Sequence, residues 1–277
     1  MTPGRVGHWL WLRLAALIVI VNGTFPILWI LATSLKTETE LTRRPITWLP
    51  DDPTLANYLR AFAEQPLLTY ILNSVIAAML STLLSILVAA LAAYALARLR
   101  IPGRSLVLAT LVAVSTFPLI TLMVPLFQLM RTLGILNTYL ALILPYAVLN
   151  LPVCTLVLTS FFQGIPQDLE NAAMIDGCSR LGALWRIIMP LAAPGVFTAA
   201  ILAFVNAWDE FLLALSFTSS QQMRTVAVGI TLYQGEYAFP WPLISAALIV
   251  ALVPIAVFIA SFQKRVVGGL MQGGLKG

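Results

Sequence analysis

The amino-acid sequence predicts an all-α membrane protein with six transmembrane helices, and two observations carry that prediction. The chain has 277 residues, of which 60% are hydrophobic and 10% are charged, whereas soluble domains are about 45–50% apolar and about 25% charged. A helix needs about 20 mostly apolar residues to cross a bilayer. Six stretches meet this length, namely residues 9–35, 69–97, 105–130, 138–162, 190–217 and 241–262.

The first stretch is interpreted as a retained span, because its apolar run is longer than the usual ~7–15 residues of a signal peptide and no clear cleavage site follows. The basic residues then set the orientation, since Lys and Arg gather in cytoplasmic loops. With six spans, one side carries Arg5, Arg13, Arg98, Arg100, Arg104, Lys264, Arg265 and Lys276. We therefore expect both termini in the cytoplasm, and the net charge of +5 indicates orientation rather than a nucleic-acid partner.

These spans divide the chain into three parts. Residues 1–68 form the first helix and an external loop, residues 69–263 form the main transmembrane domain, and residues 264–277 form a cytoplasmic tail. Within the transmembrane domain, segment 165–190 interrupts the apolar sequence on the expected cytoplasmic side.

Segment 165–190 has the signals of two short helices. Pro166 suits the first turn of a helix, and Asp168 and Glu170 follow where the positive helix end favours acidic side chains. Gly177 is a plausible stop in the left-handed conformation, and Ser179 is a candidate cap for a second helix. Helical spacing predicts that Leu169, Ala172 and Ala173 share one face. Acidic residues argue against an anionic membrane surface as its target and favour a groove on another protein.

This segment resembles the "EAA" loop of ATP-binding-cassette importer permeases in the run Glu170-x-Ala172-Ala173-x-x-Asp176-Gly177, followed by Pro190 and Pro194. Four other stretches and the tail resemble the sugar-importer subgroup, in particular the second permease subunit of maltose-type systems. They are NSVIAAMLSTLLSILVAALAAYALARL, FPLITLMVPLF, LGILNTYLALILPYA, FVNAWDEFLLAL and FQKRVVGGLMQGGLKG. Similarity covers nearly the whole chain and is weakest in residues 1–23 and 37–55. Asn171 and Cys178 depart from the usual family residues.

The resemblance implies a type I ABC importer permease fold in a bacterial inner membrane. The segment would carry a coupling helix that fits a cleft on a cytoplasmic ATPase, with Glu170, Ala172, Ala173, Asp176 and Gly177 as its coupling residues. Partners would be a second homologous permease, two ATPase subunits and an extracytoplasmic sugar-binding protein. The chain has no G-x-x-x-x-G-K-[ST] motif. ATP and Mg²⁺ would therefore belong to the partner ATPases, and this chain is expected to bind no cofactor of its own.

A second candidate site lies in the fifth predicted span. Asn206, Asp209 and Glu210 have the spacing of one helix face, and ionisable residues in a span indicate function by default. Asp209 lies about 28 Å along a helix that starts near Pro190, at about 1.5 Å per residue, so interfacial carboxylates are an equal interpretation. We treat the three residues as a candidate pathway or gate.

Other classes fit less well. An ion-coupled secondary transporter would want ionisable residues near the membrane centre and often an inverted repeat, and neither is evident. A membrane hydrolase or metal site is not expected, because His8 is the single histidine and no G-x-S-x-G or H-E-x-x-H motif occurs. An ABC permease for a non-carbohydrate solute remains an alternative.

Overall fold

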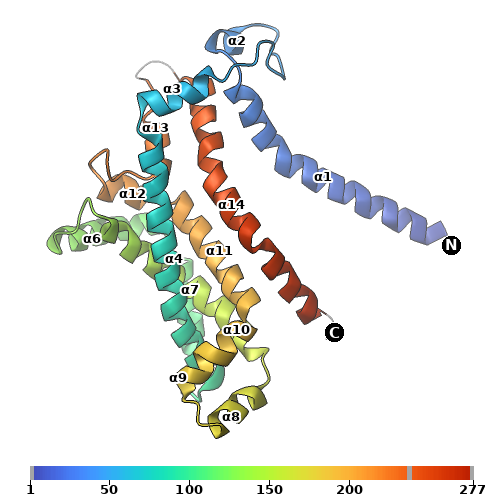
Figure 1. Cartoon of the computed structure of the whole chain (residues 1–277), viewed down its shortest axis with the longest axis vertical. Helices are drawn as coiled ribbons and strands as arrows, with labels where there is room; N and C mark the ends of the chain where they lie inside the picture. Colours follow the sequence, from blue (N-terminus) through green and yellow to red (C-terminus); the bar gives the residue numbers. More distant parts are fainter. Residues whose placement is uncertain (1–2, 236–238, 275–277) are drawn as a thin grey trace. The chain divides into compact units, whose positions relative to one another are not determined.

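The structure is a computed structural model that describes residues 3–235 and 239–274, with side chains described for residues 11–235 and 239–262. Every regular element within these residues is helical, as predicted (Figure 1). The elements are α1 (Pro3–Ser34), α2 (Glu38–Thr42), α3 (Ala56–Glu64), α4 (Leu67–Arg98), α5 (Arg104–Ser115), α6 (Leu119–Thr132), α7 (Tyr139–Gln163), α8 (Gln167–Ile175), α9 (Arg180–Ala183), a π-helical turn (Leu184–Ile188), α10 (Met189–Leu191), α11 (Ala193–Asp209), α12 (Leu212–Phe217), α13 (Val226–Thr231) and α14 (Trp241–Gly274).

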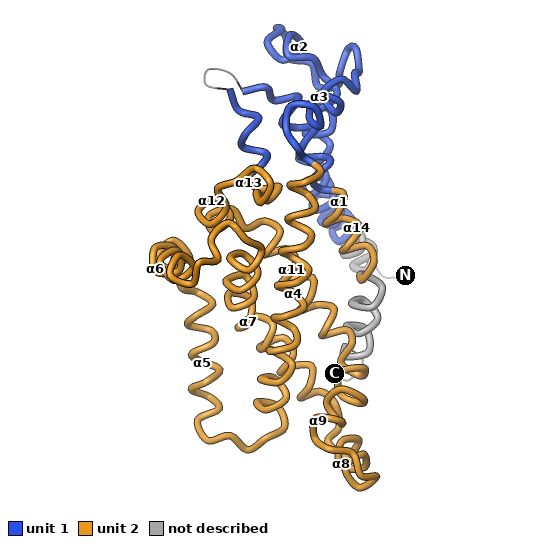
Figure 2. The backbone as a smooth tube through the Cα atoms, turned by 60° about the vertical axis from the view of Figure 1, so that its left-hand side comes forward, with its two compact units in different colours: residues 1–67, 229–252 blue, residues 68–228, 253–277 orange. Residues whose placement is uncertain are grey.

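The chain divides into two compact units (Figure 2). Unit 1 comprises Met1–Leu67 and Gly229–Leu252, and unit 2 comprises Leu68–Val228 and Val253–Gly277. Segment 165–190 and the residues of the fifth predicted span both belong to unit 2.

Four described helices are long and apolar enough to cross a membrane: Trp11–Ser34, Leu67–Arg98, Tyr139–Gln163 and Trp241–Phe262. Two bent helix pairs bring the possible number to six. The first pair, Arg104–Ser115 with Leu119–Thr132, bends by 91°, and the second, Arg180–Leu191 with Ala193–Asp209, bends by 83°. The apolar segments are therefore where the sequence predicts them, but the third and fifth are broken rather than straight.

Proline and glutamate explain where the breaks fall. Pro118 precedes α6 in an extended conformation, and a proline disfavours the helical region for the residue before it. Pro194 lies in the first turn of α11, where its missing N–H costs nothing. The predicted fifth span does not continue to residue 217, because Glu210 is extended at the end of α11 and a new helix, α12, follows.

The core of unit 2 lies between α4, α7 and α11. Ala89, Ala90 and Ala93 of α4 are fully buried there against Leu158 and Phe162 of α7 and Ala199 and Ala203 of α11. Small side chains let helix backbones approach closely inside a membrane. This packing fixes the positions of both candidate sites, because one site lies at the Arg98 end of α4 and the other lies along α7 and α11.

In unit 1, polar side chains hold the loop that follows α1. The Asn57 amide nitrogen donates to the carbonyl oxygens of Ser34 and Lys36 at 2.9 and 2.8 Å. Glu40 is buried, and its Oε1 accepts from the Thr47 hydroxyl at 2.8 Å and from the Asp51 amide at 3.0 Å. The loop is thus organised by its own hydrogen bonds.

Candidate functional site

Segment 165–190 begins with α8, whose two ends match the sequence signals. Pro166 precedes the helix, and Asp168 and Glu170 lie in its first turn. At the other end, Gly177 has φ +88°, its N–H donates to Met174 O at 3.1 Å, and the Cys178 N–H donates to Ala173 O at 2.9 Å. These two bonds form a Schellman motif, which satisfies carbonyls at the end of a helix.

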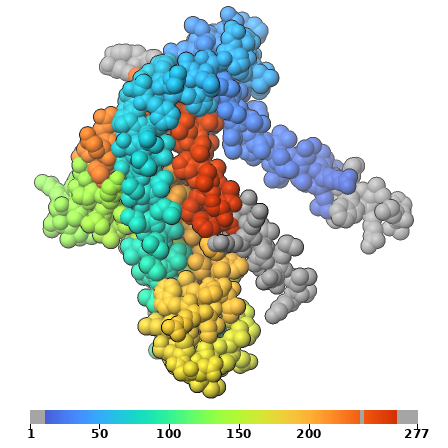
Figure 3. Space-filling model, viewed as in Figure 1, coloured from blue at the N-terminus to red at the C-terminus, as the bar shows by residue number. Residues whose placement is uncertain are grey.

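The second helix of the segment also begins as predicted. The Ser179 hydroxyl accepts from the Gly182 N–H at 3.1 Å and caps α9. Figure 3 shows the surface of the segment, in yellow, projecting beyond the transmembrane helices of unit 2. The exposed position of α8 leaves one face of the helix open.

The inward face of α8 carries a carboxylate. Glu170 and Ala173 are buried, whereas Leu169 is 45% exposed and Ala172 is also exposed. Of the three residues predicted to share one face, Ala173 packs inward and Leu169 and Ala172 lie at the surface beside it, because the helix is rotated to turn the Glu170 carboxylate toward the membrane helices. Asp176 and Gly177 are exposed.

The rotation brings Glu170 against the last turn of α4. Its Oε2 lies 3.2 Å from Arg98 Nε, and both side chains are only 6% exposed. The Tyr94 hydroxyl donates to Glu170 Oε1. Arg98 Nη2 also donates to the carbonyl oxygen of Ile165 at 2.8 Å. One arginine thus binds both the entrance to segment 165–190 and the carboxylate on its first helix.

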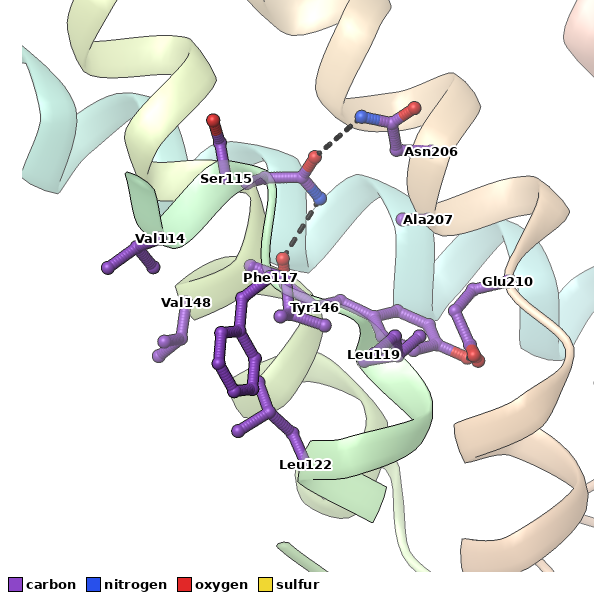
Figure 4. A pocket seen from close by; sticks show the side chains of 12 residues that line it. Val114, Ser115, Phe117, Leu119, Leu122, Tyr146, Val148, Asn206, Ala207 and Glu210 are labelled. Atoms are coloured by element: carbon purple, nitrogen blue, oxygen red, sulfur yellow. Dashed lines mark hydrogen bonds between the residues drawn. The ribbon is translucent and has the colours of Figure 1, made fainter. Parts of the chain in front are cut away.

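A second polar site lines a cavity of about 370 Å³ beside the break between α5 and α6 (Figure 4). Asn150 of α7 is buried, and its amide nitrogen donates to Tyr146 O at 2.9 Å. The exposed Asn206 of α11 donates to Asn150 Oδ1 at 3.2 Å. Phe117, at the break between α5 and α6, contributes an aromatic ring that is 52% exposed. The cavity combines amide groups with an aromatic surface.

Glu210 lines the same cavity. Its Oε1 accepts from the Leu213 amide at 2.8 Å, and its Oε2 accepts from the Ala214 amide at 3.0 Å and from the Tyr146 hydroxyl at 2.8 Å. Figure 4 shows the Tyr146 ring extending to Glu210. The carboxylate therefore joins α7 to the start of α12.

The structure brings together two of the three residues predicted in this region. Asn206 and Glu210 line the cavity, but Asp209 is exposed and is not among its lining residues. The three do not share one helix face, because Asp209 ends α11 and Glu210 is extended. Sequence reasoning missed Tyr146 and Asn150, although an asparagine within the apolar stretch 138–162 is a signal that would have found the second.

The fold is that of a membrane component of an ATP-binding-cassette transporter. Its match to a chain of a bacterial ABC transporter that imports the acidic polysaccharide alginate has a TM-score of 0.80 and 20% sequence identity, and covers 95% of this chain and 98% of the other. This likeness confirms the predicted all-helical permease fold.

The chain belongs to the family described as binding-protein-dependent transport system inner membrane component, whose model matches residues 85–270. It is 66% identical over 95% of its length to the sulfoquinovosyl glycerol transport system permease protein SmoH of Agrobacterium fabrum, covering 93% of that protein. It is 39% identical over 96% of its length to the trehalose/maltose permease protein MalG of Thermococcus litoralis, covering 96% of that protein. The predicted class is confirmed: the chain is a multi-pass permease subunit of the inner membrane rather than an enzyme.

Proposed function

We propose that this chain is the translocating permease subunit of an importer for a sugar or glycoside, delivered by an extracytoplasmic binding protein and driven by ATP hydrolysis in separate subunits. The observation that carries the proposal is the 66% identity, over 95% of the chain, to a sulfoquinovosyl glycerol permease. The trehalose/maltose permease at 39% identity supports the broader carbohydrate class. Sulfoquinovosyl glycerol, a sulfonated glycosyl glycerol, is the first solute to test.

In this proposal the exposed face of α8 meets an ATPase subunit. Ile175 is 85% exposed and Leu169 is 45% exposed, with the small Ala172 and the acidic Asp176 also on the surface. Apolar anchors with small neighbours are suited to a protein groove, because they lose water on docking. The partner ATPases hold ATP and Mg²⁺.

The cavity beside α5 and α6 is the proposed part of the solute pathway that this subunit contributes. Broken membrane helices frequently form transporter sites, because their free backbone groups and polar side chains face a cavity rather than lipid. Asn206 is the proposed solute contact, since its amide is exposed. Glu210 is assigned a supporting role, since three donors already occupy its carboxylate. The exposed Asp209 remains part of the proposed gate region.

The complete importer would contain a second homologous permease, two ATPase subunits and the binding protein. Both termini of this chain would lie in the cytoplasm, because the basic connections and segment 165–190 are then on the side of the ATPases.

The test is uptake by the whole importer. The chain is expressed with its genomic neighbours, the complex is reconstituted in proteoliposomes with ATP inside, and labelled sulfoquinovosyl glycerol is offered with the binding protein. We expect ATP-dependent accumulation. Uptake that continues with inactive ATPases, or that follows an imposed ion gradient, contradicts the ABC mechanism. ATP-dependent uptake of amino acids but of no glycoside contradicts the solute class.

The proposed solute contact has its own variant. Asn206→Ala is expected to raise the KM for uptake about tenfold, because a hydrogen bond to the solute is lost. A tenfold change corresponds to about 1.4 kcal/mol of binding free energy. Gln128→Ala is the matched control, since this exposed amide of α6 lies outside the cavity. An Asn206→Ala complex with unchanged KM contradicts the assignment.

A further inference from the structure

The buried side of α8 suggests a role for Glu170 other than contact with a partner. The residue is 5% exposed, and its carboxylate faces Arg98 and Tyr94 of α4. A side chain in this position presents almost no surface to a docking protein. An ATPase that bound Glu170 directly would first have to separate it from α4.

The cluster is built to resist that separation. Arg98 and Tyr94 are four residues apart on α4, so they lie on one helix face and hold the Glu170 carboxylate from two points. The Arg98 Nε–Glu170 Oε2 contact at 3.2 Å is an ion pair without hydrogen-bond alignment. Removing one charge leaves the other buried and unpaired, which is strongly unfavourable in a site with little water.

Arg98 also contacts the chain at the start of segment 165–190. Its Nη2 binds the carbonyl of Ile165 at 2.8 Å, just beyond the end of α7, while its Nε faces α8. The same guanidinium thus holds the segment at its entrance and on its first helix. A displacement of α8 would therefore be transmitted directly to the end of α4, rather than being absorbed by the connection 164–166.

We propose that Tyr94, Arg98 and Glu170 form an internal joint that makes α8 and the end of α4 move as one body. Glu170 and Arg98 are positioning residues in this proposal, and the exposed residues of α8 carry the docking. The inference rests on the proposed docking of α8 to an ATPase, and adds the route by which movement enters the membrane helices.

A double-mutant cycle in the whole importer tests the joint. Glu170→Gln, Arg98→Met and the double variant are compared for thermal inactivation midpoint, for co-purification of the ATPase, and for glycoside moved per ATP hydrolysed. Each single variant should lower the transport-to-ATP ratio at least tenfold while ATP hydrolysis persists. The fold-decrease of the transport-to-ATP ratio in the double variant should be smaller than the product of the two single fold-decreases, because neither buried charge is then left without its partner. Asp52→Asn, which changes an exposed carboxylate in the loop after α1, is the control.

The opposite pattern overturns the joint. If Glu170 mainly binds the ATPase, Glu170→Gln removes the ATPase from the complex while Arg98→Met does not. The fold-decrease in the double variant then equals the product of the two single fold-decreases. Wild-type behaviour of both single variants also overturns it. The inactivation midpoint needs no transported solute, so the coupling between the two residues is measured even if the wild-type importer moves no glycoside and the proposed function fails.

A covalent link between positions 98 and 170 gives a second test. If the two residues only stabilised the fold, the link would not change the transport-to-ATP ratio. In a background carrying Cys154→Ala and Cys178→Ala, the Arg98→Cys and Glu170→Cys changes are combined and bridged with thiol cross-linkers of graded length. Bridging should raise the transport-to-ATP ratio above that of the unbridged double variant, because the link replaces the joint. Transport abolished by every bridging length would show that α8 must leave α4 during the cycle, and the proposal would be wrong.

Discussion

At the scale of single residues, Gly177 ends α8 in a conformation that other residues resist. Its φ is +88°, and a left-handed backbone costs residues with a Cβ roughly 1–2 kcal/mol. No atom lies within 4 Å of an added Cβ, so the cost of a substitution there is backbone strain rather than a clash.

Gly177→Ala should therefore weaken the end of α8 and lower co-purification of the ATPase, whereas Gly177→Asn should be milder, because asparagine tolerates this conformation. Gly134→Ala is the matched control, since Gly134 has φ +68° and equally open surroundings. We expect a similar loss of stability there with the ATPase still bound. Equal loss of the ATPase in both variants contradicts a local role for Gly177.

Glu40 is the residue through which we expect the loop of unit 1 to respond to pH. Burial alone raises the pKa of this carboxyl, but hydrogen bonds from Thr47 and Asp51, with the positive charges of Lys36 and Arg43, together hold the pKa below its usual value. A lowered folded-state pKa means stability that is fully present above the unfolded value, about 4.3, and is lost as pH falls through the folded value.

Amide exchange in residues 37–51 should therefore be slow at pH 7, after correction for intrinsic rates, and should accelerate below about pH 4. Glu40→Gln should remove this pH dependence, while Glu38→Gln, which changes an exposed carboxylate, should retain it. Protection that is the same at pH 7 and pH 3.5 in the wild-type chain would contradict the assignment.

At the scale of elements, hydropathy predicts where apolar segments occur but not where they bend. Residues 105–130 are mostly apolar and include no charged residue. Hydropathy does not encode the direction of a helix, so it does not reveal that the two helices there meet at 91°. The short helices of segment 165–190 were predictable, since caps and stops are local signals. The partner of Glu170 was not predictable, because Arg98 is distant in the sequence and becomes a neighbour only when α4 and α7 pack.

The contact between α7 and α11 depends on a glycine that sequence patterns do not distinguish from others. A Cβ at Gly195 would lie 2.3 Å from Phe161 Cγ, so Gly195→Ala should force the helices apart and cost about 1–3 kcal/mol. The thermal inactivation midpoint should fall accordingly. In a Phe161→Ala background, Gly195→Ala should cost less, because the two nearest atoms, Cγ and Cδ2, are then absent.

Gly23→Ala is the control for that experiment, because Gly23 is also helical and has no atom within 4 Å of an added Cβ. This change should be neutral or slightly stabilising, since alanine favours a helix over glycine. If Gly195→Ala behaves like Gly23→Ala, then Phe161 has room to move and the close approach is not required.

At the scale of the whole molecule, the proposed docking gives α8 two tasks on different faces of the helix. Glu170 and Ala173 face the membrane helices of unit 2, while Ile175 and Asp176 face outward. A helix that docks on one face and is fixed on the other transmits displacement with little loss. Substitutions on the two faces should therefore fail differently in the assembled importer.

Ile175→Asp should disrupt assembly, because a charge at a docking anchor must lose its water on binding. The Kd for the ATPase should rise at least about tenfold, which corresponds to about 1.4 kcal/mol. Since Ile175 is 85% exposed, the permease itself should keep its inactivation midpoint. Leu59→Asp, at a 75% exposed leucine of α3, should leave ATPase binding unchanged. Tight ATPase binding by the Ile175 variant would place the docking surface elsewhere, whereas lost binding with an intact permease separates docking at Ile175 from transmission at Glu170.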